Sequence, residues 1–346
     1  MLKANILHFI ESQFFEDIMS ESIVSSLLFS IKQITIYFGL TIVVAGVLGG
    51  CLNIIVFLSL RTFRQNSCSF YLTIMSILNI GELLVDLLPR ILLAIYNTDG
   101  TETSLFYCKF RLYLVQICTL LSLTCFCLAT FDQYCATCSR QRLQKFCNMK
   151  FARRLVIIFG CIWILHGIPY LIFFQHILSP ITRKVNCSMV HPIFLQYRIY
   201  VIVLILFGIL PLVITISFGS LAFYNTRQIP HYTIPLLRRE LDKQLTTMVL
   251  LQIFMNIFTL LPYTIVNMIS LNMKTIDDPL LQAQVQLRSI ITLLLYYVYY
   301  ANPFYIYICV SERFRRQLIY VLFRMHQNRC KQQRKIIVIN QISPQS

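Results

Sequence analysis

The residues best able to do chemistry stand inside or beside long apolar runs. Residues 124–143 read TCFCLATFDQYCATCSRQRL, so an apolar run meets the triplet Asp132-Gln133-Tyr134 and then turns basic. Glu82 stands within another apolar run, and ionisable residues inside a membrane are costly and generally functional. Three histidines show no spacing typical of metal ligands: His166, His176 and His191. The role of these groups depends on which elements carry them and which side of a membrane they face.

The composition predicts a membrane protein. Hydrophobic residues make up 57% of the 346 residues and charged residues 13%, and the mean hydropathy is +0.68. A soluble domain of this length needs a more polar surface. Stretches of the roughly 20 mostly apolar residues that a membrane-spanning helix needs occur seven times: 33–60, 69–96, 109–136, 152–175, 198–224, 244–271 and 287–310. A bilayer offers no water to backbone groups, so we expect an all-α membrane protein with a bundle of seven transmembrane helices.

The basic residues predict the orientation of the chain. With the N-terminus outside, most of the 30 Lys and Arg residues fall on inner loops and on the C-terminal segment, as the positive-inside rule requires. Topology and anionic membrane lipids therefore explain the net charge of +16, and nucleic acid is not predicted as a partner. The N-terminus lacks the pattern of a cleavable signal, because acidic residues interrupt it: Glu11, Glu16, Asp17 and Glu21.

Four parts of the chain follow from this topology. They are an extracellular N-terminal tail at 1–32, the bundle at 33–310, an amphipathic helix at 311–325 and a basic cytoplasmic tail at 326–346. The amphipathic helix is expected to begin at Ser311 as its N-cap, with Glu312 in the first turn, and to lie on the inner membrane surface. Cys330 in the tail is placed for palmitoylation, and the alternative is an unmodified thiol.

The cysteines test the topology. Of the 13, only Cys108 and Cys187 fall outside, where disulfides persist. We expect them to form a bridge, provided that their Cα atoms approach within about 7 Å; the alternative is two free thiols. The bridge would join the loop after the fourth helix to the outer end of the third. Asn186 begins a sequon for glycosylation that overlaps Cys187, and a glycan there would be crowded by the bridge.

These features resemble the rhodopsin-like (class A) G-protein-coupled receptors over nearly the whole chain. The landmark residues of five of the family's helices recur in order: Asn53, Trp163, Pro211, Pro262 and Pro303. The DQY triplet follows Cys108 at the separation that the family keeps before its Asp-Arg-Tyr, and NPFYIY from Asn302 resembles Asn-Pro-x-x-Tyr. The resemblance implies a plasma-membrane receptor that binds an extracellular ligand and promotes nucleotide exchange on a heterotrimeric G protein, without enzymatic activity or a cofactor.

The resemblance also assigns a coupling role to the triplet, with one substitution. The family's Arg pairs with its neighbouring Asp and with an acid at the foot of the sixth helix; here Gln133 replaces it, while Asp132 and Asp242 keep the acids. An uncharged amide cannot form an ionic lock, but it can form a weaker hydrogen bond to a carboxylate. The alternative is that Gln133 caps a solvated helix end.

Other departures lie along the same activation path. The residues that precede Pro262 differ from the family's sixth-helix motif, and in the last motif Ile306 occupies the Tyr position. Tyr307 is the expected substitute, because its spacing to Phe314 matches the family. A polar cluster that holds a sodium ion in the family is also present, with Glu82 in place of the usual Asp: Asn53, Glu82, Ser122 and Asn302. The cluster either binds an ion or holds a protonated carboxyl group.

The outer half predicts the ligand class. Val115 stands where amine receptors carry an Asp, and Tyr296 stands where retinal-binding proteins carry a Lys. A basic, aromatic rim suits a peptide or another acidic ligand. The candidate ligand residues are Arg111, Val115, Gln116, Arg198, Tyr263, Arg288, Thr292 and Tyr296. Arg90 is ambiguous, because Asp86 lies one helical turn before it and can neutralise it.

Two alternatives to a signalling receptor remain. The altered motifs also fit a decoy or scavenging receptor that binds ligand without signalling. A seven-helix transporter or channel is the less favoured class, because the sequence shows neither internal repeats nor broken helices that meet at the membrane midplane. The sequence does not identify the ligand, and a screen of peptide libraries with a promiscuous G-protein reporter would reduce the uncertainty most.

Overall fold

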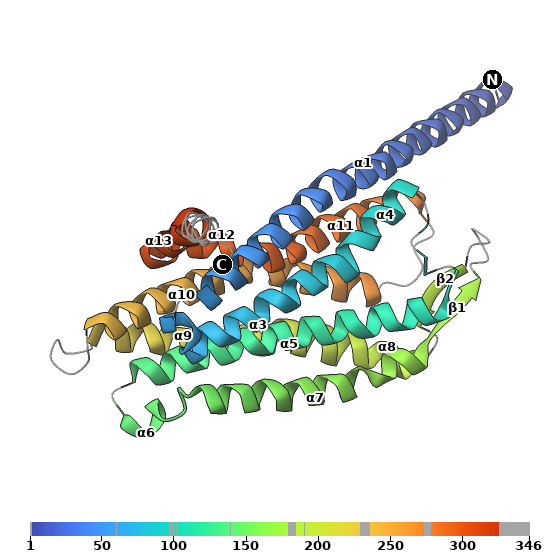
Figure 1. Cartoon of the computed structure of the whole chain (residues 1–346). Coiled ribbons are helices and arrows are strands. Elements are labelled where there is room, and N and C mark those ends of the chain that lie inside the picture. The colour runs from blue at the N-terminus through green and yellow to red at the C-terminus, as the bar shows by residue number, and fades with distance from the viewer. Residues whose placement is uncertain are drawn as a thin grey trace, which may run out of the picture.

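The computed structural model describes residues 2–59, 61–96, 98, 100–101, 103–138, 140–178, 185–189, 191–228, 236–272 and 278–324, and in some elements, among them 2–20 and 236–242, it describes the backbone alone. Within these residues the chain is helical apart from one β-hairpin. Figure 1 shows long helices lying side by side, with the hairpin and the outer part of α1 at the same end of the bundle. Asp242 and Asn186 are described by their backbone only, and Cys330 lies outside the described residues.

The elements follow the expected spans closely. In the first half they are α1 (Leu2–Ser59), α2 (Arg61–Arg64), α3 (Ser67–Glu82), the π-helical segment η1 (Leu83–Leu87), α4 (Leu88–Tyr96), α5 (Leu105–Thr137), α6 (Gln141–Gln144) and α7 (Met149–Phe173). The hairpin consists of β1 (Phe174–Leu178) and β2 (Val185–Met189). The remaining elements are α8 (Pro192–Tyr197), the π-helical η2 (Arg198–Ile209), α9 (Leu210–Gln228), α10 (Leu236–Asn272), α11 (Pro279–Ala301), α12 (Pro303–Val310), α13 (Glu312–Ile319) and the π-helical η3 (Tyr320–Arg324).

Seven membrane crossings result if one bent pair of helices counts as a single span. Six helical stretches in the described chain are long and apolar enough to cross a membrane, and α11 with α12 forms the seventh, bent by 53°. The break falls where Pro303 begins α12, and proline cannot donate the backbone hydrogen bond that would continue α11. The expected bundle of seven spans is therefore present, with a bend in the last span that the sequence analysis did not anticipate.

Two π-helical segments change the rotation of their helices in the outer half of the bundle. The first, η1, joins α3 to α4 and carries Asp86; Pro89, which has no backbone donor, follows it directly. The second, η2, begins at Arg198 and precedes Pro211. A π-helical turn inserts extra residues into a helix and so turns the following side chains to another face. These segments decide where the outer charged residues point.

Both ends of the bundle differ from the sequence expectation in detail. The segment expected as a tail at 1–32 is helical from Leu2 and continuous with the first span. At the other end, Ser311 caps α13 by accepting a hydrogen bond from the backbone N–H of Phe314, as expected. Phe314 is buried and packs against the rings of Phe57 and Tyr307, so the first turn of α13 rests on the bundle.

The interior has a tyrosine-rich outer part and a mixed inner part. All four tyrosines of α11 are buried between helices: Tyr296, Tyr297, Tyr299 and Tyr300. The inner part packs Phe57, Phe126 and Tyr307 with aliphatic side chains of α3 and α10. Buried tyrosines bring hydroxyl groups that need partners, so the outer core is also a hydrogen-bond network.

Candidate ligand and signal-coupling sites

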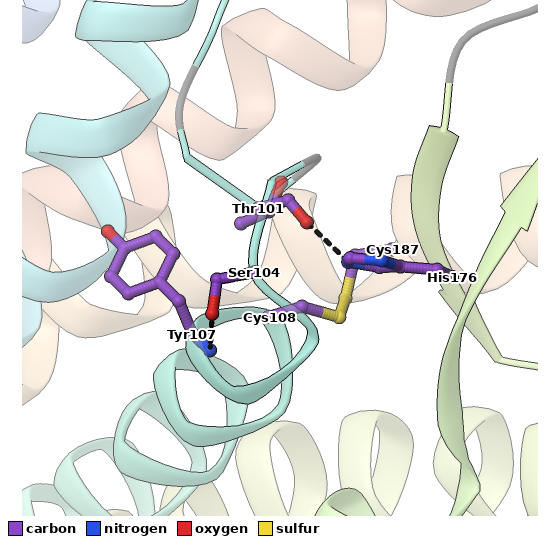
Figure 2. The surroundings of a disulfide bond; sticks show 6 residues. All are labelled: Thr101, Ser104, Tyr107, Cys108, His176 and Cys187. Carbon is purple, nitrogen blue, oxygen red and sulfur yellow. Dashed lines mark hydrogen bonds between the residues drawn. A yellow bond between two sulfur atoms is a disulfide. The ribbon is translucent and has the colours of Figure 1, made fainter.

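The outer end of the bundle is braced by a disulfide between α5 and the hairpin. Cys108 and Cys187 are bonded, with their Cα atoms 5.9 Å apart, which confirms the expected pairing. Figure 2 shows the bridge beside His176, whose Nε2 lies 2.6 Å from the carbonyl oxygen of Thr101. Ser104 caps α5 by accepting from the N–H of Tyr107. The other cysteines that the structure describes form no disulfide.

The hairpin carries the glycosylation sequon on its second strand. Asn186 pairs with Ile177 in the antiparallel ladder, next to the pair of His176 and Cys187. The position of the Asn186 side chain is not described, so its glycosylation stays a prediction.

Below the disulfide, Asp86 joins three parts of the bundle. Its carboxylate accepts from Arg90 Nε at 3.2 Å, from Arg111 Nη2 at 3.2 Å and from the Tyr297 hydroxyl at 2.5 Å. Arg90 also donates to the Tyr297 oxygen at 2.9 Å. The Asp86 hub, formed by Asp86, Arg90, Arg111 and Tyr297, therefore links η1 and α4 to α5 and α11. The internal pairing considered for Arg90 is present.

The hub corrects the expectation for Arg111. Its side chain is only 8% exposed and also donates from Nε to the Val85 carbonyl at 3.1 Å. A guanidinium held this far from water needs a carboxylate partner, because the cost of burying an unpaired charge is large. Arg111 is thus part of the helix packing, and Arg288 remains as the cation expected to meet a ligand. Arg288 is exposed on α11, and none of the described acids forms an ion pair with it.

The other ligand candidates are divided between the rim and the core. Arg198 lies over the Phe174 ring, 5.8 Å from its centroid. Tyr263 stacks on Tyr296 at 4.4 Å, and the Tyr296 hydroxyl is bonded to those of Tyr300 and Thr119. Tyr263 is half-buried, whereas Tyr296 is buried.

Three polar candidates remain. Gln116 is buried with its amide nitrogen unpartnered, Val115 is half-buried, and the Thr292 hydroxyl donates to the Arg288 carbonyl at 3.0 Å.

At the middle of the bundle, polar side chains are buried with few partners. Asn53, Glu82, Ser122 and Asn302 are all buried, as the resemblance implied. Ser122 donates to Asn79 Oδ1 at 2.5 Å, and Asn79 in turn reaches the Tyr300 carbonyl. Sequence analysis missed Asn79, although it stands one helical turn before Glu82.

The unpartnered atoms of this cluster identify what it can hold. The two carboxylate oxygens of Glu82, the Asn53 side-chain oxygen and both polar atoms of the Asn302 side chain have no hydrogen-bond partner. Buried polar atoms are nearly always satisfied, so each of these unpartnered atoms points to a missing partner. Carboxylate and amide oxygens are hard ligands, so the residues present fit a small cation or water.

At the cytoplasmic end, the Asp132-Gln133-Tyr134 triplet contacts neighbouring helices. Gln133 is 1% exposed, so the alternative that it caps a solvated helix end is wrong. Its Oε1 accepts from the Thr246 hydroxyl on α10 at 3.1 Å, while its Nε2 has no partner. Asp132 accepts from Ser67 at the start of α3, at 2.6 Å. The Tyr134 ring packs on Phe218 at 5.5 Å.

These contacts change the expected pairing of the triplet. Gln133 was expected to bond a carboxylate, but its described partner is the hydroxyl of Thr246, four residues after Asp242. The side chain of Asp242 is not described, so its pairing with Gln133 stays a prediction. Ser67 and Thr246 were missed, because a lone hydroxyl in an apolar run gives no sequence signal of a partner on another helix.

The motif that follows Asn302 places one of its tyrosines in the core. Tyr307 is fully buried, and its hydroxyl donates to Gln252 Oε1 of α10 at 2.6 Å. Tyr305 instead is 43% exposed and donates to the Ala45 carbonyl. Tyr307 is therefore the tyrosine that points into the bundle, as its spacing to Phe314 predicted.

Comparison with known families agrees with this architecture. The family model described as 7 transmembrane receptor (rhodopsin family) matches residues 49–307, a stretch that includes every landmark residue from Asn53 to Tyr307. A comparison with curated proteins found no match. The chain belongs to the rhodopsin family of seven-transmembrane receptors. It is therefore a multi-pass membrane receptor, not an enzyme, and its family signals through heterotrimeric G proteins at the plasma membrane.

Proposed function

We propose that this receptor recognises an acidic extracellular ligand, most simply a peptide, through Arg288. The supporting observation is an exposed guanidinium near the outer end of α11 that pairs with no described acid. Arg198, held over Phe174 beside the hairpin, adds a second cation to the rim. Val115 in place of an acid argues against amine ligands, since a buried ammonium group needs a carboxylate partner. A guanidinium binds carboxylates through two parallel hydrogen bonds, which suits acidic side chains or a peptide terminus.

We further propose that Gln133 and Tyr307 carry the signal to the G protein. Both are buried at the inner end, and both are held by neutral hydrogen bonds to α10. Moving α10 outward would break these bonds and release Gln133 toward the cytoplasm. Gln133 can then donate a hydrogen bond to a G-protein carbonyl, although it cannot provide the charge of an Arg.

A ligand screen followed by one substitution tests the ligand assignment. Peptide libraries are screened on cells with a promiscuous G-protein reporter, and the first active peptide is then titrated on variants. Arg288→Gln should weaken its potency at least tenfold, which corresponds to about 1.5–3 kcal/mol for a hydrogen bond to a charged group. Gln286→Ala, an exposed change on the same helix, is the matched control. Unchanged potency in Arg288→Gln would refute the assignment.

A decoy receptor is the second candidate, and the neutral residue at position 133 is what favours it. A decoy binds and internalises the same peptide without nucleotide exchange. Measuring ligand uptake and G-protein activation in the same cells distinguishes the two, because a decoy gives the first signal and not the second.

We also propose that the Glu82 cluster binds a cation such as sodium. Support comes from the unpartnered oxygens of Glu82 and Asn53 and from the unpartnered amide of Asn302. Replacing sodium chloride by choline chloride should lower the thermal stability of the purified receptor, and Glu82→Gln should remove the difference. If the wild type has the same stability in both salts, the cluster holds no sodium.

A further inference from the structure

A cavity opens on the side of the bundle, between three helices and away from the inner-end contacts of Gln133 and Tyr307. It has a volume of about 290 Å³ and lies between α1, the second span (η1 with α4) and α11. Its walls are mainly apolar: Leu28, Ile31, Leu87, Leu93, Ile290 and Leu294. This volume is close to the lower end of the range for small-molecule sites, about 300 Å³. There is room for one narrow ligand.

The cavity lies along the outer part of α1, where Leu28, Ile31, Lys32 and Thr35 line it. Its floor lies where α1 approaches α4 at Gly39, since a Cβ added there would meet Ile91 Cγ1 at 3.0 Å. Thr35 and Lys32 line the cavity four and seven residues before Gly39, so they lie on the same helix face, progressively further out. Figure 1 shows the outer part of α1 extending beyond its neighbours. Lys32 lines the cavity and is exposed, so we take it as the mouth of the cavity.

Two cations border this apolar space. Lys32 is exposed, and it forms no ion pair with any acid whose side chain is described. No acid stands three or four residues away from it in α1. Arg90 also lines the cavity, and its side chain is 40% exposed while that of its partner Asp86 is 6% exposed.

The Asp86 hub therefore presents its basic side to the cavity. Asp86 lies behind Arg90 and is shared with Arg111, so it does not face the cavity itself. Glu82 lies one turn deeper and does not line the cavity. Among the described residues, an anion at the mouth thus meets a guanidinium and an ammonium group, and none of the lining residues is an acid.

We propose that this cavity binds a long-chain fatty-acid anion from the outer leaflet. The carboxylate would lie between Lys32 and Arg90, and the first part of the chain would fill the apolar space between α1, α4 and α11. A single chain fits the small volume, and one carboxylate suits the planar guanidinium. This site is separate from the rim residue Arg288. Arg288 lies two residues before Ile290 on α11, and positions two apart do not share a helix face.

Photolabelling of the purified full-length receptor tests the proposal. The receptor is placed in nanodiscs of zwitterionic phospholipid with a fatty acid that carries a diazirine in its chain, and labelled peptides are mapped by mass spectrometry. Labels should fall on α1, α4 and α11. Lys32→Gln should reduce labelling about fivefold, as expected for an exposed ion pair. Ala94→Phe, which fills the cavity, should reduce it at least as much, and Arg288→Gln should leave it unchanged.

Competition defines the headgroup. Unlabelled fatty acid should compete about fivefold better than the fatty alcohol of the same chain length, because only the acid carries the charge. Equal competition by acid and alcohol, or labelling unchanged in both Lys32→Gln and Ala94→Phe, would overturn the site. Stronger competition by a lysophospholipid than by the fatty acid would overturn the occupant. The assay needs neither the extracellular ligand nor a G protein, so its outcome is independent of the proposed function.

Discussion

The two ends of this bundle are held by different kinds of contact. At the outer end, one carboxylate binds two guanidinium groups and a tyrosine, and a disulfide ties the hairpin to α5. At the inner end, α10 is held by neutral bonds from Thr246 to Gln133 and from Tyr307 to Gln252. The charged restraint that the family keeps near its Asp-Arg-Tyr motif is thus absent from the described contacts of Gln133, while a buried charged hub lies at the other end.

This difference in contact type is a difference in free energy. Removing one partner from a buried ion pair costs about 3–5 kcal/mol, whereas a neutral hydrogen bond contributes about 0.5–1.5 kcal/mol. The outer half should therefore stay packed while the inner end of α10 separates. A receptor with this distribution can open toward the cytoplasm at low cost.

The largest effect is expected from Asp86→Ala. The change leaves Arg90 and Arg111 beside each other without their carboxylate, so the free energy of unfolding should fall by about 3–5 kcal/mol. Unfolding of the purified receptor in SDS mixed micelles measures this. Glu312→Ala, which removes the exposed pair with Arg316, is the control and should change stability by less than about 1 kcal/mol.

A double variant separates charge from packing at the same place. Replacing Asp86 by Leu and Arg111 by Met should recover most of the lost stability, since apolar replacement of a buried ion pair is often nearly neutral. Arg90 is 40% exposed and can extend its head toward water. If Asp86→Ala is as stable as the wild type, the Asp86 hub does not stabilise the outer end. The proposed difference between the two ends would then be wrong.

The next effect is expected from Ser67→Ala at the inner end. This change removes the 2.6 Å hydrogen bond to the Asp132 carboxylate, so stability should fall by about 1.5 kcal/mol. The matched control is Ser69→Ala, two residues along the same helix, whose buried hydroxyl has no partner. Equal losses in the two variants would mean that packing at the start of α3, rather than the bond to Asp132, sets the cost.

Gln133→Arg tests whether the neutral inner end permits basal signalling. We expect measurable ligand-independent G-protein activation in the wild type. An Arg at this position can pair with Asp132 and Asp242, which should stabilise the inactive state by about 1 kcal/mol and lower basal activity about fivefold. Adding Asp242→Ala should restore it. The measurement is nucleotide exchange at matched surface expression, with Gln133→Met as the control for side-chain size.

The opposite result would change the functional assignment. A silent wild type, together with a Gln133→Arg variant that is more active, would show that the missing charge disables coupling and would favour the decoy receptor.

The smallest effect is expected from Thr246→Val. The change removes the hydroxyl that donates to Gln133, so α10 should leave the inactive position more easily. A loss of about 0.5 kcal/mol, the low end for a neutral hydrogen bond, raises basal activity about twofold. Thr247→Val is the control, because its exposed hydroxyl bonds only within its own helix. If the basal activity of Thr246→Val is unchanged, the hydrogen bond between Thr246 and Gln133 does not restrain α10.

The features that the sequence determined by itself depend on residues close together in the chain or on the order of the spans along it. Long apolar runs predicted the helices, because the bilayer requires internal backbone hydrogen bonds. Sidedness left only Cys108 and Cys187 outside, and their disulfide is present. The one-turn spacing of Asp86 and Arg90 indicated an internal pair, and the spacing of Tyr307 to Phe314 indicated which tyrosine turns inward.

Only the tertiary structure decided which groups from different helices meet. Arg111 reads as a free basic residue in the sequence, but η1 turns Asp86 toward it across the bundle. Likewise, nothing local tells Ser67 from Ser69, yet only Ser67 reaches Asp132. Helix rotation and depth set these partnerships. Both depend on the packing of all seven spans together, so spacing along one helix cannot reveal them.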